Sequence, residues 1–492
     1  MSDSTDWRNL VVTLDDRGVE RLTDAAVAAV HSLHVPPATR SPLSPAELHS
    51  LITAIEICPE NGVGLHEVLK ELGENLWSHG VQPSNPATVA HLHPPTLLPA
   101  VVTDLSIAAT NQSMDSWDQA PAATELELHL MTWLAQLAGL PDTGSGVMTS
   151  GGTASNMLAI TLARSAASAM IGVDVLKTGL PDEARRWRIV CSDQAHFSVQ
   201  RAAAQLGLGR DAVVSVPSTP TGEMDIDALD VVLAVLATDD LQVLAVVATA
   251  GTTDLGAIDP LDAVAERARR VGAWYHVDAA VGGAFLLSDR LRPRLRGLEL
   301  ADSITVDFHK LWWQPFNASA LIVRDVERFE LLRVRSNYLD RGDELEGMVN
   351  LVGRSLDTSR RFDAAKVVAT LRAVGSTSLA AMLEYLVDLT RYAGSLIESQ
   401  PALELVAAPS TVMCVFRVKG ASDDEIRRIQ QRLLARGDMV LGRTDIEGRA
   451  ALKFTFVNPL ATRDDVERLV ELVLGEFHEL HESTDAEACI DN

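Results

Sequence analysis

Residues 147–156 read Val-Met-Thr-Ser-Gly-Gly-Thr-Ala-Ser-Asn and combine three kinds of local structure. The apolar residues 147–149 predict a short strand, the glycine pair a turn, and residues 155–169 a helix. Glycines such as Gly152 let the backbone approach an anion, and the helix that follows points free N–H groups at the same spot. With the hydroxyl groups of Thr153 and Ser155, this turn suits a phosphate group, although an ordinary structural turn fits the same residues. It is neither a P-loop, since no Gly-Lys-Ser/Thr follows, nor a Gly-x-Gly-x-x-Gly fingerprint.

Strand-sized apolar runs recur on both sides of this turn, from residue 145 to about 325, with helix-length segments between them. We expect strands at 147–149, 188–191, 213–216, 244–249, 274–277, 303–306 and 320–323, and helices at 155–169 and 261–271. Strands that alternate with helices typically build a largely parallel sheet covered on both faces. The sequence therefore predicts an α/β fold, with a large domain around a mostly parallel sheet of about seven strands.

The rest of the chain predicts three further parts around this large domain, which we place at residues 91–370. Residues 1–90 form a helical N-terminal segment, with helices expected at 22–33 and 46–57. Residues 371–480 form a smaller C-terminal α+β domain, in which helices at 379–400, 423–436 and 463–480 flank strands at 412–418 and 451–456. Residues 481–492 are polar and predict a loose tail.

Composition narrows the class of protein. Of the 492 residues, 47% are apolar and 22% charged, which is ordinary for a soluble globular protein. The net charge of −25 argues against nucleic acid and anionic membrane surfaces as partners. The four cysteines show no Cys-x-x-Cys spacing, so we expect no metal site and no disulfide framework. The first residues do not resemble a signal peptide and the apolar runs are too short to span a bilayer, so we expect a cytoplasmic protein.

Three side chains are expected just past the ends of three of these strands. Asp278 follows the strand 274–277, and a buried carboxylate there calls for a cationic partner, such as a protonated pyridine nitrogen, unless it caps a helix. Lys310 follows the strand 303–306, at the sheet edge where α/β proteins bind ligands, and burial can make such a lysine a Schiff-base nucleophile. His196 follows the strand 188–191, and its ring is suited to stacking on a planar cofactor. Each of the three alone also fits an ordinary structural role.

The four features together match the parts of pyridoxal 5'-phosphate (PLP). The glycine turn matches the phosphate, His196 the ring face, Asp278 the pyridine nitrogen and Lys310 the aldehyde. No nucleotide-binding interpretation of the glycine turn accounts for Asp278 and Lys310 as well. A catalytically silent PLP-binding or interaction protein is the remaining alternative to a PLP enzyme.

With these residues the chain resembles the PLP-dependent group II amino-acid decarboxylases, which have the aspartate-aminotransferase fold (PLP fold type I). The resemblance covers roughly residues 80 to 470 and rests on the motifs at 149–153, 249–253, 276–280, 307–310 and 360–366. Residues 111–119 look most like bacterial L-2,4-diaminobutyrate decarboxylases and their lysine-acting relatives. The resemblance implies decarboxylation of an L-amino acid to the amine, in a homodimer with shared active sites.

The resemblance also implies roles for individual residues. Gly152, Thr153, Ala154 and Ser155 bind the phosphate, which Asp307 and His309 flank. His196 stacks on the ring, Thr253 bonds near its hydroxyl group, Asp278 pairs with its nitrogen, and Lys310 holds the aldehyde. Arg360 binds the substrate carboxylate or its surroundings, Tyr338 on a lid at about 334–356 protonates Cα, and the partner subunit supplies part of the pocket, including His93.

Three positions depart from the common pattern of this family. Val281 stands where many relatives have tyrosine, Asn317-Ala318 where Ser-Cys or Asp-Cys is usual, and Ser359 where glycine or threonine is frequent. Such changes leave two other outcomes open, both known from secondary metabolism: decarboxylation coupled to oxidative deamination, and β-elimination from an S-substituted cysteine. Tyr338 favours plain decarboxylation.

Overall fold

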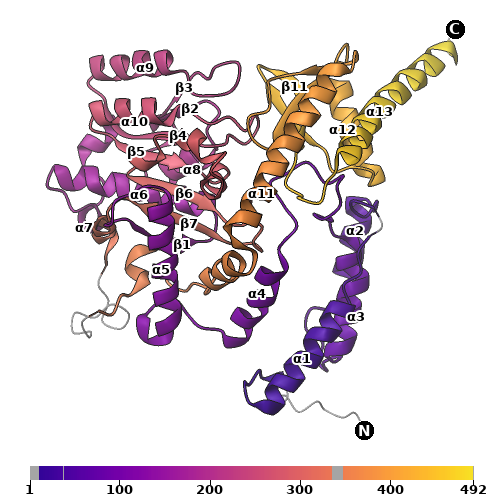
Figure 1. The fold of residues 1–492 in the computed structure, drawn as a ribbon, viewed down its shortest axis with the longest axis horizontal. Coiled ribbons are helices and arrows are strands. Elements are labelled where there is room, and N and C mark those ends of the chain that lie inside the picture. Colours follow the sequence, from indigo (N-terminus) through magenta and orange to yellow (C-terminus); the bar gives the residue numbers. More distant parts are fainter. Residues whose placement is uncertain (1–9, 37, 335–346, 491–492) are drawn as a thin grey trace. The chain divides into compact units, whose positions relative to one another are not determined.

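The computed structural model describes residues 10–36, 38–334 and 347–490 (Figure 1). The chain forms two compact units. The larger one comprises residues 92–398 and 405–415, and the smaller one residues 1–91, 399–404 and 416–492. The domain boundaries at residues 90, 370 and 480 stay a prediction, but residues 371–398 group with the larger unit, because one helical segment crosses position 370 without a break there.

The larger unit is built around a seven-stranded, mostly parallel sheet, which confirms the predicted fold class. Its order is β1-β7-β6-β5-β4-β2-β3. The run from β3 to β6 is parallel, whereas β7 lies antiparallel to both β6 and β1. The direction reverses because residues 308–318 return the chain without a helical crossover. The strands are β1 (Ser145–Thr149), β2 (Trp187–Ser192), β3 (Val213–Val216), β4 (Gln242–Thr249), β5 (Trp274–Asp278), β6 (Ser303–Asp307) and β7 (Ser319–Val323).

Helices cover this sheet on both faces. Every residue of β5, β6 and β7 is buried, which requires cover above and below. The longest of these helices, α6, begins at Gly152 and packs along its length on the sheet, with Leu158 and Leu162 in the core. The helices of this region are α5 (Pro121–Leu137), α6 (Gly152–Met170), α7 (Val175–Thr178), α8 (Ser198–Gln205), α9 (Ile226–Thr238) and α10 (Leu261–Arg270).

The N-terminal segment is helical, as expected. Helix α1 (Asp16–His31) begins earlier than predicted because the Asp15 side chain caps it by accepting the Gly18 N–H. Helix α2 (Pro45–Thr53) starts at a capping box formed by Ser44 and Glu47. Helix α3 (Leu65–Asn75) in the same segment and α4 (Leu98–Thr110) in the larger unit had no predicted counterpart.

The C-terminal part contains a four-stranded sheet in the order β10-β11-β9-β8. Helix α12 (Asp423–Arg436) matches its predicted range and begins at a capping box of Ser422 and Glu425. Helix α13 (Arg463–Ile490) extends through the region predicted as a loose tail, because no glycine or proline ends it at residue 480. The strands are β8 (Leu403–Leu405), β9 (Met413–Val418), β10 (Gly442–Ile446) and β11 (Arg449–Thr455).

Helix α11 (Ala364–Ser399) is long and apolar enough to cross a membrane by length and composition alone. Gly375 interrupts it with a φ of 77°, which a helix does not allow, so two helices meet there. Core helices of soluble proteins pass the same test of length and composition.

Candidate active site

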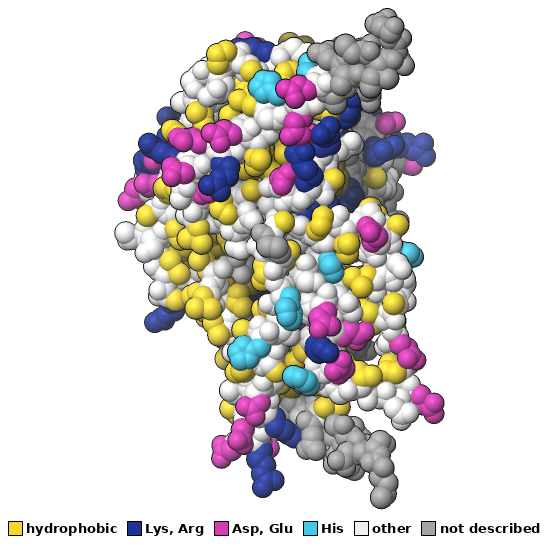
Figure 2. Space-filling view, turned by 90° about the vertical axis from the view of Figure 1, so that its right-hand side faces the viewer, with side chains coloured by type: hydrophobic (Ala, Val, Ile, Leu, Met, Phe, Trp, Pro, Cys, Tyr) yellow, Lys and Arg dark blue, Asp and Glu magenta, His cyan; other side chains and the backbone are white. Residues whose placement is uncertain are grey.

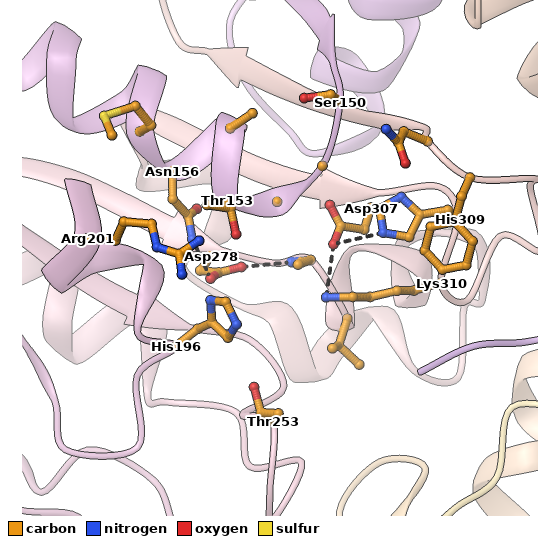
Figure 3. Close-up of a pocket in the computed structure, with 18 of the residues that line it drawn as sticks. Ser150, Thr153, Asn156, His196, Arg201, Thr253, Asp278, Asp307, His309 and Lys310 are labelled. Atoms are coloured by element: carbon orange, nitrogen blue, oxygen red, sulfur yellow. Dashed lines mark hydrogen bonds and ion pairs between the residues drawn. The ribbon is translucent and has the colours of Figure 1, made fainter. Parts of the chain in front are cut away.

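The predicted PLP-binding residues meet around one cavity of about 590 Å³ at the carboxyl ends of the parallel strands (Figure 3). Asp278, the last residue of β5, and Lys310, just past β6, approach it from two sides. Because these strands are parallel neighbours, residues far apart in sequence reach the same edge. Of the predicted residues, Gly152, Thr153, Ala154, His196, Thr253, Asp278, Asp307, His309 and Lys310 line the cavity.

The start of α6 lies where the sequence predicts a phosphate-binding turn. No side chain caps this helix, and in the part of the chain that the structure describes the N–H groups of residues 152–154 have no hydrogen-bond partner. These N–H groups and the positive end of the helix dipole favour an anion. A Cβ at Gly152 would lie 2.9 Å from Oδ2 of Asp307, so any larger residue would force this carboxylate to shift. Ser155, also predicted to bind the phosphate, does not line the cavity: its hydroxyl bonds to Thr149 at 2.7 Å, and its N–H donates to the Gly151 carbonyl at 3.0 Å.

Lys310 lies in an acidic and partly buried setting. Its Nζ is 2.9 Å from Oδ2 of Asp307, whose carboxylate also accepts a hydrogen bond from Ser319. His309 is held by its Nδ1, 2.8 Å from the carbonyl of Ala318, and burial lowers its pKa. Since the Ala318 backbone makes this bond, the departure from the family pattern at position 318 leaves the support of His309 intact.

Asp278 and His196 face the other end of the cavity. The Asp278 carboxylate accepts the Ala280 N–H at 3.1 Å and the side-chain amide of Asn156 at 2.8 Å. The Nδ1 atom of His196 lies 2.8 Å from the Ser198 hydroxyl. Burial lowers the pKa of His196, against the opposing effect of Asp278, so the ring is neutral at pH 7. A neutral ring that stacks and a carboxylate that pairs with nitrogen suit the pyridine of PLP.

The predicted substrate-binding residues are placed differently. Arg360 does not line this cavity: its guanidinium pairs at 3.0 Å with Glu127, which is fully buried, and lines a smaller neighbouring cavity of about 190 Å³. His93 reaches the site through Phe316, a lining residue, with ring centroids 5.3 Å apart. Tyr338 lies outside the described residues, so its role stays a prediction.

The three departures from the family pattern all lie at the site. Val281 and Asn317 line the main cavity, and Ser359 lines the smaller one. Ser150, Asn317 and Asp357 line both cavities, so the two adjoin.

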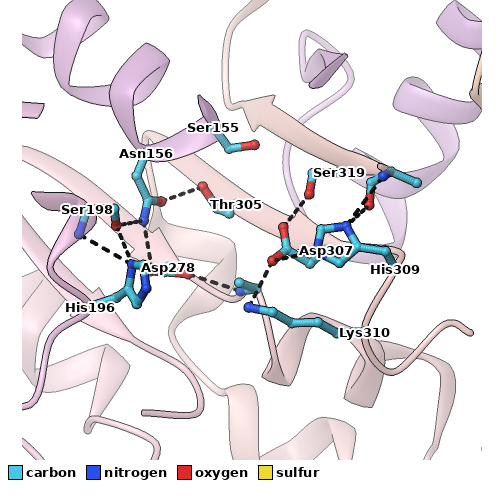
Figure 4. A network of polar contacts seen from close by, with 12 residues as sticks. Ser155, Asn156, His196, Ser198, Asp278, Thr305, Asp307, His309, Lys310 and Ser319 are labelled. Atoms are coloured by element: carbon cyan, nitrogen blue, oxygen red, sulfur yellow. Dashed lines mark hydrogen bonds and ion pairs between the residues drawn. The ribbon is translucent and has the colours of Figure 1, made fainter. Parts of the chain in front are cut away.

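Sequence reasoning missed the buried polar groups behind the cavity. Asn156 and Ser198 connect Asp278 to His196 by hydrogen bonds, and Thr305 donates to the amide oxygen of Asn156 (Figure 4). One signal was present: polar residues alternate within the apolar strands at 276 and 278 and at 303, 305 and 307, so they share one face of each strand.

Comparison with known proteins identifies the family. Residues 50–419 match the pyridoxal-dependent decarboxylase conserved domain. The chain is 35% identical to L-2,4-diaminobutyrate decarboxylase of Acinetobacter baumannii, over 98% of both chains. It is 40% identical to the enzyme of that name from Rhizobium meliloti, over 87% of this chain and 85% of that one.

Solved structures agree with these relatives. The glutamate decarboxylase domain of diaminobutyrate-pyruvate transaminase and L-2,4-diaminobutyrate decarboxylase from Vibrio parahaemolyticus superposes with a TM-score of 0.89, at 36% identity, covering 96% of this chain and 99% of that one. Oryza sativa TDC with PLP and tryptamine gives 0.83 at 25% identity, covering 95% of this chain and 99% of that one. These relatives do not favour oxidative deamination or β-elimination. The chain therefore belongs to the pyridoxal-dependent decarboxylase family and is a PLP-dependent amino-acid decarboxylase.

Proposed function

We propose that the substrate is an L-amino acid with a second, cationic amine, of the L-2,4-diaminobutyrate type, and that the product is the corresponding diamine. The observation that carries this proposal is the similarity, over nearly the whole chain, to two L-2,4-diaminobutyrate decarboxylases. Lysine and ornithine belong to the same chemical class and are the nearest competitors.

The charges around the cavity support a cationic side chain. Three described residues that line it are carboxylates: Asp278, Asp307 and Asp357. The first serves the pyridine nitrogen and the second pairs with Lys310, which leaves Asp357 for the substrate. The lining arginine, Arg201, lies beside Asp278, away from the Lys310 end where a substrate amine would react (Figure 3). An acidic side chain would find no such partner near Lys310 among the described lining residues.

Each group in the site has a task in this reaction. PLP, when bound, accepts the electron pair left behind on Cα. The start of α6 would hold the phosphate, and Asp278 would keep the pyridine nitrogen charged. Lys310 would hold the cofactor through its aldehyde, at the end of the cavity where the substrate amine must approach. The Cα–carboxylate bond then breaks, carbon dioxide leaves, and we assign to Tyr338 the proton that Cα receives in its place.

We further propose that the enzyme is a cytoplasmic homodimer with active sites shared between the subunits. Hydrophobic side chains reach the protein surface (Figure 2). In α4, the exposed ones are Leu98, Val101, Val102 and Leu105. A helix that exposes this much apolar surface favours a partner that covers it. Light scattering on the purified enzyme should therefore give twice the mass of one chain, and a monomer would refute this assignment.

A substrate panel tests the proposed function. The PLP-loaded enzyme is offered L-2,4-diaminobutyrate, lysine, ornithine, tyrosine, glutamate and S-substituted cysteines, and the products are identified by mass. We expect carbon dioxide and a diamine from diaminobutyrate at the highest kcat/KM, and no product from Lys310→Ala. A higher kcat/KM for tyrosine or glutamate would refute the substrate class. Aldehyde with peroxide, or pyruvate with thiol, would refute plain decarboxylation.

A further inference from the structure

A row of buried polar side chains lies between α6 and the sheet, behind the cavity. Trp274, His276 and Asp278 alternate along β5 and so share one face, and Ser303 and Thr305 do the same on β6. The register of the parallel pair sets His276 beside Ser303 and Asp278 beside Thr305. All five are buried, so each polar group needs a partner inside the protein.

Asn156, in the first turns of α6, belongs to the same row and contacts its members on β5 and β6. Its side chain is 1% exposed. A carboxylate at pH 7 accepts hydrogen bonds but donates none, so the atom that faces Asp278 must be the amide nitrogen, at 2.8 Å. The amide oxygen then faces Thr305, whose hydroxyl donates to it at 2.7 Å, and His276, whose Nε2 lies at 3.0 Å. The amide orientation is therefore fixed by its surroundings (Figure 4).

His276 is a neutral donor in this row. Its side chain is fully buried, and burial lowers its pKa to about 4. Because Nε2 faces an oxygen that can only accept, Nε2 carries the proton. The Nδ1 atom then accepts from the Ser303 hydroxyl at 2.9 Å, and that hydroxyl in turn receives the indole N–H of Trp274 at 2.8 Å. The competing contact of Nδ1 with the Ser303 carbonyl is longer, at 3.1 Å.

Asn156 also governs His196. Its second amide hydrogen donates to the Ser198 hydroxyl at 2.8 Å. The hydrogen of that hydroxyl is then directed to Nδ1 of His196 at 2.8 Å, and the Ser198 N–H points at the same atom at 3.3 Å. With two donors aimed at Nδ1, the neutral ring of His196 carries its proton on Nε2.

All donors in this row thus point toward the two groups that serve the cofactor ring. We propose that Asn156 is a positioning residue that holds the Asp278 carboxylate and the His196 tautomer as the ring requires, with its own amide oriented by His276 and Thr305. The two groups on which it acts lie on different elements, β5 and the segment before α8, so one side chain sets the alignment of both. This role goes beyond the choice of substrate, which the row does not touch.

The proposal predicts effects that depend on hydrogen bonding and not on the space the side chains fill. Asn156→Asp preserves shape but replaces the donor to Asp278 by a second carboxylate, and Asn156→Ala removes the donor. Thr305→Val and His276→Leu remove the groups that orient the amide, whereas His276→Gln keeps a donor where Nε2 stood. Thr161→Val is the matched control, because its buried hydroxyl donates only to the Met157 carbonyl of its own helix.

Two readouts on the PLP-loaded protein need no substrate, so they are independent of the proposed function. The first is the pH midpoint of the near-visible absorbance change, which reports the proton on the Lys310 nitrogen joined to the cofactor. A pyridine nitrogen that pairs less well with Asp278 withdraws less electron density from the Lys310 nitrogen. The pH midpoint of the absorbance change should therefore rise by about half a pH unit or more in Asn156→Ala and Asn156→Asp. The second is the near-visible circular dichroism of the bound cofactor, which reports how firmly the ring is held.

We expect the dichroism to lose most of its amplitude in both Asn156 variants and in His276→Leu, and to recover in His276→Gln. Thr305→Val should move both readouts in the same direction by less, and Thr161→Val should move neither. If an Asn156 variant does not fold, His276→Gln against His276→Leu carries the test. Unchanged midpoint and dichroism in Asn156→Asp, or in His276→Leu, would overturn the proposal, as would an equal shift in Thr161→Val.

Discussion

Replacing His276 by glutamine should make the protein less sensitive to acid. Burial lowers the pKa of His276 to about 4 in the folded protein, against 6.5 in the unfolded chain. Below pH 6.5 the unfolded chain takes up a proton that the folded protein accepts only near pH 4. The stability that this histidine contributes is therefore complete above pH 6.5 and is lost as the pH falls toward 4.

The size of this effect follows from the two values. Each unit between them is worth roughly 1.4 kcal/mol, so the full loss is about 3 kcal/mol, of which about 2 kcal/mol is lost by pH 5. Glutamine retains a donor toward Asn156 and does not titrate. Between pH 8 and pH 5 the wild type should therefore lose about 2 kcal/mol more of its free energy of unfolding than His276→Gln does.

Urea unfolding at pH 8 and pH 5, at one protein concentration and with PLP present, measures this difference. His129→Gln is the control, because His129 lies exposed on α5, and it should lose as much stability as the wild type. An equal loss in the wild type and in His276→Gln would refute a neutral, buried His276.

Three further predictions concern other parts of the site. Gly152→Ala should raise the dissociation constant for PLP about tenfold or more in a fluorescence titration, because the added Cβ would lie 2.9 Å from Asp307. Gly475→Ala is the control: its Cβ meets no atom within 4 Å, so the dissociation constant should not change. Arg360→Met should lower the free energy of unfolding by about 3–5 kcal/mol, because it leaves the Glu127 carboxylate buried without its partner. Adding Glu127→Gln should restore part of that loss. If urea unfolding shows that the two substitutions cause additive losses, Arg360 and Glu127 do not stabilise the protein as a pair. Asp357→Asn should raise KM for L-2,4-diaminobutyrate roughly 3–5-fold and change KM for tyrosine little, as expected if the exposed Asp357 carboxylate pairs with the side-chain amine of the substrate. An equal rise of KM for both amino acids would exclude Asp357 as that partner.

Much of the fold could be predicted because most of its helices and strands are specified by local sequence patterns. Apolar, β-branched runs such as 244–249 occur as buried strands, and the capped stretch 423–436 forms the expected helix with the expected ends. The direction of β7 could not be read from its residues, since an apolar strand fits either direction and only its pairing decides. Helix ends that depend on caps, such as Asp15 before α1, were likewise missed.

The residues of the site likewise include some that could be predicted from the sequence and some that could not. Nine of the predicted cofactor residues lie around one cavity. They do so because each lies near the end of a strand, and the sheet brings the ends of its strands together. Arg360 was expected near the substrate, but it pairs with Glu127, a residue more than two hundred positions away that no local pattern connects to it.

The sequence by itself determined that a glycine turn, a histidine, a carboxylate and a lysine each lie at the end of a strand of an α/β sheet, because each of these placements depends on residues adjacent in the chain. Only the tertiary structure decided which buried groups hold these four in place. Asn156 meets Asp278 and Thr305 because α6 packs over β5 and β6, and hydrogen bonds between such distant positions exist only once the chain has folded.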